Sequence, residues 1–152
     1  MQLSQQEPII LRAQRLFGWR CSKDTFQLAG AGILLDLSLV SGPALQNVEK
    51  IDLTGSGNNT LKLSLADMLQ SFDDSNVFNS SNTTSGLAAK VTRNQLMVDG
   101  DTGDKVVLTD LASWTAAGTN VVANGETYVV YNHNTSAQQL LIDQAILVLA
   151  VL

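Results

Sequence analysis

Residues 48–65 constrain the fold more than any other stretch, because two apolar runs flank a turn rich in glycine, serine and asparagine. Leu61 and Leu63 alternate with polar residues, which is the period of a strand with one buried face. Ile51 and Leu53 show the same two-residue step. Glycine and asparagine between the runs tolerate the left-handed region of backbone space. The stretch therefore predicts a strand, a sharp polar turn and a second strand.

Similar patterns predict short strands along the rest of the chain. Alternating or continuous apolar runs bounded by turn residues indicate a strand over 33–39 and later strands at 87–91, 96–98, 106–108 and 140–142. The final run, Ile146–Leu152, is almost wholly apolar. It predicts a central strand covered on both faces, or one covered within a longer protein. The polar stretch 71–86 predicts a long exposed loop.

Two local signals complete the prediction of the fold. Ser64, with Asp67 three residues later, resembles a capping box and predicts a short helix over 65–70. Asn124-Gly125 between apolar runs predicts a hairpin with a type I′ turn. The fold class is therefore all-β, as a sandwich or an irregular parallel solenoid-like coil, with one short helix and this hairpin.

Length and composition agree with one domain of short strands. The chain has 152 residues, which is long enough for a core without disulfides or metal. It is 45% hydrophobic but only 15% charged, and much of the remaining polarity is Asn, Ser, Thr and Gly. That balance favours strands joined by turns over long solvated helices.

Charge divides the chain into a basic leader and an acidic body. Residues 1–23 carry four basic residues and one acidic residue, and their pattern permits a short helix. The leader is either an amphipathic docking segment or a segment that packs weakly on the domain. Residues 24–152 form the all-β module and carry a net charge of −8. This acidity argues against nucleic acid and anionic membrane surfaces as partners.

The single cysteine, Cys21, excludes an internal disulfide framework and any multi-cysteine zinc site.

No run approaches the roughly 20 apolar residues that a membrane-spanning helix needs. The N-terminus also lacks the pattern of a secretory signal. If the domain works outside a cell, we expect its export signal elsewhere in a longer polypeptide.

The acidic turn over 99–104, Asp-Gly-Asp-Thr-Gly-Asp, is the main candidate for a binding site. Calcium prefers six to eight oxygen ligands from carboxylates, carbonyls and water. Asp99, Asp101 and Asp104 could converge on one such ion. The alternative is an Asp-Gly turn selected for backbone geometry and solubility.

Catalysis finds little support in the sequence, and we expect no enzyme. The nucleophile-elbow, zinc-protease and P-loop motifs are all absent. His133, the only histidine, is expected in a surface turn. Asp73 and Asp74 lie in the polar loop, where a solvated pair is the expected state. Trp114, Tyr128 and Tyr131 could line a sugar-stacking surface, although packing in the core is favoured.

Several blocks resemble a module of large calcium-dependent adhesins of the RTX type, exported by bacterial type I secretion. These blocks are DTFQLAGAGILLDLS, NVEKIDLTGSGNNTLKLSLADML, NQLMVDGDTGDKVVL, ETYVVY and QLLIDQAI, and they cover about residues 24–146. The resemblance implies a secreted, cell-surface, β-rich module that binds calcium and serves adhesion or biofilm formation beside neighbouring domains of a larger polypeptide. It places the metal ligands at Asp99, Asp101 and Asp104. The nonapeptide repeats of such proteins are absent, and a carbohydrate-binding module that contacts surface glycans is the alternative.

Overall fold

The structure is a computed structural model that describes residues 24–40, 45–46, 48–55, 57–72, 77–78, 84–85 and 92–151. The predicted leader over 1–23 with Cys21, the Asp73/Asp74 pair and the strand at 87–91 lie outside these residues. The chain is mostly β, with one α-helix in the described part. This confirms the prediction of a strand-rich fold with a single short helix.

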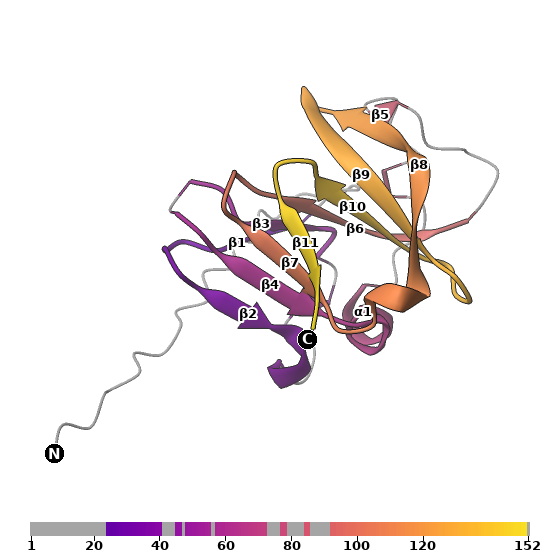
Figure 1. Cartoon of the computed structure of the whole chain (residues 1–152), viewed down its shortest axis with the longest axis horizontal. Coiled ribbons are helices and arrows are strands. Elements are labelled where there is room, and N and C mark those ends of the chain that lie inside the picture. Colours follow the sequence, from indigo (N-terminus) through magenta and orange to yellow (C-terminus); the bar gives the residue numbers. More distant parts are fainter. Residues whose placement is uncertain are drawn as a thin grey trace, which may run out of the picture.

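The strands form a seven-stranded and a four-stranded sheet, called here the large and the small sheet (Figure 1). The large sheet has the order β1 (Thr25–Gln27), β3 (Lys50–Asp52), β6 (Asn94–Asp99), β10 (Gln138–Asp143), β9 (Glu126–His133), β8 (Trp114–Ala123) and β5 (Thr84–Ser85). The small sheet has the order β11 (Leu147–Ala150), β7 (Lys105–Leu108), β4 (Thr60–Leu63) and β2 (Leu34–Asp36).

Eight of these strands alternate between the two sheets along the chain. β1, β3, β6 and β10 pair in parallel in the large sheet, while β2, β4, β7 and β11 pair in parallel in the small sheet. Each strand of the first set is followed by one of the second set. We call these eight strands the parallel stack. β9, β8 and β5 extend the large sheet with antiparallel pairs, and β8 and β9 together form the hairpin arm.

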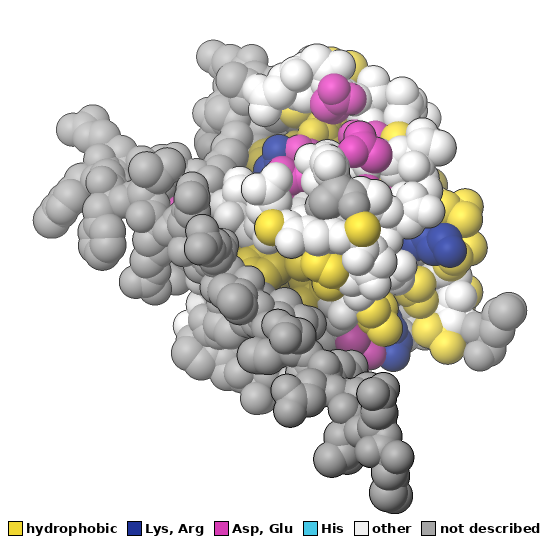
Figure 2. All heavy atoms as spheres, turned by 90° about the vertical axis from the view of Figure 1, so that its left-hand side faces the viewer, with side chains coloured by type: hydrophobic (Ala, Val, Ile, Leu, Met, Phe, Trp, Pro, Cys, Tyr) yellow, Lys and Arg dark blue, Asp and Glu magenta, His cyan; other side chains and the backbone are white. Residues whose placement is uncertain are grey.

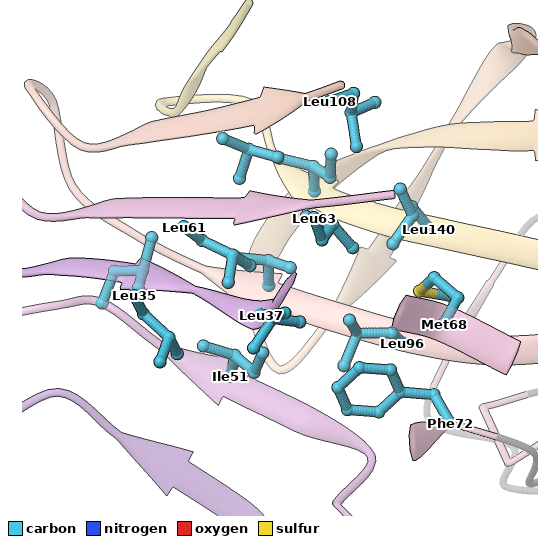
Figure 3. Close-up of a cluster of buried hydrophobic side chains, with 14 of the residues drawn as sticks. Leu35, Leu37, Ile51, Leu61, Leu63, Met68, Phe72, Leu96, Leu108 and Leu140 are labelled. Atoms are coloured by element: carbon cyan, nitrogen blue, oxygen red, sulfur yellow. The ribbon is translucent and has the colours of Figure 1, made fainter. Parts of the chain in front are cut away.

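The main core lies between the two sheets (Figure 3). Side chains from both sheets point toward one another there, and Met68 and Phe72 close one end of the interior. Leu61 and Ile51 are fully buried, although they come from different sheets. Burying such leucine and isoleucine side chains supplies about 1.5–3 kcal/mol each, which is the main source of stability.

Helix α1 (Leu65–Ser71) forms where the capping signal predicts it. The Ser64 side chain accepts a hydrogen bond from the Asp67 N–H, and the Asp67 carboxylate accepts from the Ser64 N–H. The helix presents Met68 to the core.

The predicted strand over 33–39 is only half right. β2 ends at Asp36, and Leu37–Leu39 form a 3-10 helix. Asp36 accepts hydrogen bonds from both the N–H and the hydroxyl of Ser38, and these bonds turn the backbone out of the strand. Leu39 is consequently 81% exposed.

The two strands of residues 48–65 are present, but they do not pair with each other. β3 lies in the large sheet and β4 in the small sheet, so the polar turn carries the chain from one layer to the other. The predicted hairpin at Asn124-Gly125 is confirmed, since Ala123 pairs with Glu126 around it. Asn124 and Gly125 have φ of 53° and 88°, the positive values that a type I′ turn requires.

The prediction of a central final strand is wrong for the described chain, and its alternative, a strand covered within a longer protein, stays a prediction. β11 lies at the edge of the small sheet, and Leu147, Leu149 and Val151 are exposed. β10 is buried on both faces along its whole length. On the outer face of the large sheet, Leu141 of β10 and Met97 of β6 join Phe78 in a second apolar cluster.

Candidate functional site

The acidic turn between β6 and β7 is hydrogen-bonded to the turn between β3 and β4. Asp104 is 2% exposed, and its carboxylate accepts hydrogen bonds from two backbone N–H groups. One oxygen accepts from the Asn59 N–H at 2.8 Å, and the other accepts from the Asp101 N–H at 2.7 Å. Asp104 therefore ties its own turn to the β3–β4 turn, a contact that residue spacing alone does not reveal.

The other two aspartates of this turn also have partners on the protein. Asp101 is exposed, and one of its oxygens accepts from the Gly55 N–H at 2.9 Å. Asp99 accepts from the Tyr128 hydroxyl at 2.5 Å and forms an ion pair with Lys50. The three carboxylates thus serve three different contacts with neighbouring strands and turns.

Glycine in the acidic turn has a steric reason. Gly103 has φ of 107°, and a Cβ built there would lie 2.3 Å from Asn58 Oδ1. The turn therefore needs glycine both for its backbone conformation and for its close approach to the preceding turn. The close approach of the two turns accounts for the glycine at position 103.

Within the described ranges, no group of three or more histidine, cysteine, aspartate or glutamate side chains is placed to hold a metal ion. Calcium at Asp99, Asp101 and Asp104 stays a prediction of the sequence. An ion bound there would compete with the N–H groups, the Tyr128 hydroxyl and Lys50 for the same oxygens.

Other aspartates repeat one turn motif at the ends of strands. Asp52 accepts from the N–H and hydroxyl of Thr54, and Asp143 accepts from the Ala145 N–H. Asp36 does the same with Ser38. In each case the carboxylate holds the backbone two residues on and begins the turn toward the next element. The similarity of the segments DLSL and DLTG is the sequence signal for this motif.

A row of acidic side chains crosses the outer face of the large sheet at the C-terminal ends of β3, β6 and β10. Asp52 pairs with Asp99 across β3 and β6, and Asp143 stands at the next register position on β10, opposite Tyr128. Lys50 is the basic partner in this row. Figure 2 shows acidic side chains gathered on the upper part of the face that it presents, with a basic side chain among them.

The electrostatics of this row raise two pKa values. Burial raises the pKa of the Asp143 carboxyl, and the nearby charges of Glu126, Asp99 and Asp101 add to this increase. Burial and the hydrogen bond to Asp99 also raise the pKa of the Tyr128 hydroxyl. Asp143 consequently carries its negative charge at a cost to the folded state.

The aromatic candidates for sugar binding are mostly interior. Trp114 and Tyr128 are buried at 6% and 1% exposure, in the main core and the second cluster respectively. Tyr131 is half-buried and packs against the main core. A sugar ring could not stack on Trp114 or Tyr128 unless they left these positions.

His133 is not in a surface turn, which corrects the prediction from its polar neighbours. It is the last residue of β9, it is buried, and its ring meets the Trp114 ring edge to face at 5.0 Å. Its Nδ1 accepts from the Thr135 N–H. These contacts give the histidine a packing role.

No helix in the described part of the chain combines the length and apolarity needed to cross a membrane. Comparisons with protein-family models, with curated proteins and with solved structures found no match to this chain.

Proposed function

We propose that this protein is a structural module of a larger secreted bacterial surface protein, and that its parallel stack serves as a rigid spacer between neighbouring domains during adhesion. In this proposal the stack is a short solenoid-like coil, in which one strand from each sheet makes one turn. The supporting observation is the hydrogen bonding between successive turns. Gly32 N–H donates to Asn58 O, Lys105 N–H to Asn59 O, and Leu147 N–H to Asp104 O.

A spacer of this kind must resist extension as one unit. Parallel strands in successive turns bond across the whole stack, so the ends of the coil cannot separate without breaking the shared interior. This mechanical role uses the buried apolar contacts and the linked turns, and it requires no catalytic residue.

Force spectroscopy on tandem copies of this chain, joined end to end, tests the spacer role. We expect one cooperative unfolding event for each copy, with a contour-length gain of about 3.6 Å for each residue released. A series of small, low-force steps would contradict the proposal, because it would mean that the turns separate independently.

We further propose calcium as the ion that stiffens the acidic turn after export. The support is the density of carboxylates at Asp99, Asp101 and Asp104 and the exposure of Asp101. Calcium at a hundredfold excess over its dissociation constant would add about 2.7 kcal/mol to the free energy of unfolding. Melting curves in calcium and in EDTA measure this change, and Asp101→Asn should remove most of it. Identical curves would reject calcium and leave the spacer role intact.

Location at the cell surface is the remaining part of the proposal. Antibody raised against the purified chain should label intact source cells, and added protease should remove the label. Labelling that requires permeabilised cells would contradict it. Glycan-array binding by the unmodified chain that survives EDTA would instead select the carbohydrate-binding alternative.

A further inference from the structure

The two sheets are unequal in width on one side of the molecule. β11 is the edge strand of the small sheet, and it directly follows β10 in the chain. The large sheet does not end at β10, because β9 and β8 lie beyond it. Figure 1 shows both strands of the hairpin arm extending beyond β11. Within the described chain, no strand of the small sheet lies beyond β11 to cover them.

The inner face of the large sheet becomes more exposed beyond β11, where the small sheet no longer covers it. Ile142 of β10 is 1% exposed, and Val129, its partner on β9, is half-buried. Directly opposed residues on neighbouring strands point to the same face. Val122 on β8, opposite Thr127, is 46% exposed on that face. The inner face of the arm is therefore half-buried along β9 and exposed along β8.

The backbone of β11 is open on the same side. Leu147 N–H donates to Asp104 O, toward β7. Because successive residues of a strand direct their N–H and C=O groups to opposite sides, the groups of Val148 and Ala150 point to the free edge. We call this edge, with the adjoining inner face of β9 and β8, the ledge.

The ledge lacks the features that protect other edges. Residues 146–151 carry no charge, and Leu147 and Leu149 are exposed. At the opposite edge of the small sheet, β2 ends at Asp36, whose carboxylate lies 2.8 Å from Lys62 Nζ. Natural sheets block strand addition with charged edges of this kind, so β11 is the less protected of the two edges that the described part of the small sheet has.

We propose that the ledge binds an extended, uncharged segment of another polypeptide, with apolar side chains at every second residue. The segment adds to β11 through the free backbone groups of Val148 and Ala150. Its apolar side chains cover Val129 and the neighbouring inner face of the arm. Main-chain hydrogen bonds supply affinity and the alternate side chains supply selectivity, as in strand addition generally. The inference rests on the fold and not on the proposed function.

A complete second copy does not fit as the occupant. In each copy the small sheet is covered by the large sheet over the strands of the parallel stack. A copy that paired through its own small sheet would therefore bring its large sheet into the layer that the hairpin arm already occupies. A single extended strand meets no such obstacle.

The test uses the full chain and a fluorescent synthetic peptide of alternating valine and threonine with a lysine at each end. We expect saturable binding to the unmodified protein, measured by fluorescence polarisation. Ala150→Pro removes an N–H from the free edge, where proline is tolerated because that N–H makes no bond to β7. It should weaken binding at least about tenfold, or ~1.4 kcal/mol. Ala150→Thr keeps the N–H and should bind as the unmodified protein does.

Ala116→Glu gives an independent check, because it places a charge on the open inner face opposite Tyr131 without changing the backbone of β11. It should also weaken peptide binding, while melting curves confirm that each variant is folded. Absence of saturable binding to the unmodified protein would overturn the proposal, as would equal binding to Ala150→Pro. Sedimentation that shows a dimer lost in Ala150→Pro would identify a second copy as the occupant and would also overturn it.

Discussion

The parallel stack and the hairpin arm hold their strands together in different ways. In the stack, each pair of strands encloses apolar side chains between two sheets, and carboxylates such as Asp104 bond one turn to the next. The arm depends on cross-strand pairing, with a bulge between Ala116 and Asn120. All six residues over 115–120 are exposed.

This difference places the stability of the molecule in the stack. Its contacts join residues far apart in the sequence, so losing one contact weakens the whole unit. The arm buries Val121, Tyr128 and Val130 in the second apolar cluster on its outer face, so it has less interior to disturb than the stack has. Substitutions in the two regions should therefore differ in how much stability they remove and in how much of the molecule they destabilise.

The largest effect is expected for Leu61→Ala in the stack. Leu61 is fully buried between the sheets, so truncation leaves a cavity and should lower the free energy of unfolding by about 2–5 kcal/mol. Urea denaturation measures the loss. Leu34→Ala, at an exposed position one strand away, is the matched control and should change stability by less than about 0.5 kcal/mol. Equal losses would contradict the position of the core.

Asp104→Ala should have the next largest effect. It leaves the N–H groups of Asn59 and Asp101 without their acceptor in a buried turn, at a cost of about 2–3 kcal/mol. Asp101→Ala removes a single, exposed acceptor and should cost less. Chemical denaturation of both variants compares them, and a larger loss for Asp101→Ala would show that Asp104 is not the main link between the turns.

Gly125→Ala probes the arm. At φ of 88° an alanine is strained by about 1 kcal/mol. We expect faster hydrogen exchange at the amides of β8 and β9, with protection in β3, β4 and β6 nearly unchanged. Uniform loss of protection across both regions would show that the arm and the stack unfold together.

The smallest effect concerns pH and Asp143. Its pKa is raised above the ordinary value of 3.8, so the folded state holds this proton more tightly than the unfolded chain does. The resulting stability is present at low pH and is lost as pH rises from 3.8 through the folded-state pKa. Asp143→Asn keeps an oxygen for the Ala145 N–H and should remove this loss, a gain below about 1 kcal/mol at neutral pH.

Asp36 supplies a control of opposite sign for this pH dependence. Its hydrogen bond with Lys62 lowers the pKa of the carboxyl, so its contribution is present at neutral pH and is lost as pH falls. Asp36→Asn should therefore flatten the acid side of the stability curve. Suppose that the pH dependence of the free energy of unfolding, measured from acid to neutral pH, changes in the same direction in both variants. The directions assigned to the two pKa shifts are then wrong.

Local features could be predicted from the sequence because their causes are local. The Ser64–Asp67 capping box and the Asn124-Gly125 turn each depend on side chains within a few residues, and both form as expected. The end of β2 at Asp36 is also local, but the alternation of leucines through residue 39 hid it.

The pairing of strands could not be predicted, because it depends on contacts distant in sequence. β3 and β4 flank a hairpin-like turn yet enter different sheets, since their partners β6 and β7 come from elsewhere in the chain. An apolar composition also failed to distinguish β10, which is buried, from β11, which lies at an edge. The separate partners of Asp99, Asp101 and Asp104 arise from these same distant contacts.

Native-state hydrogen exchange tests most directly whether the parallel stack is one cooperative unit. We expect the most protected amides of β3, β4, β6, β7 and β10 to exchange with a single free energy, equal to that of global unfolding. Amides over 115–120 of the arm should exchange at a lower free energy. Separate free energies for the two sheets of the stack, or an arm as protected as the stack, would contradict this cooperativity.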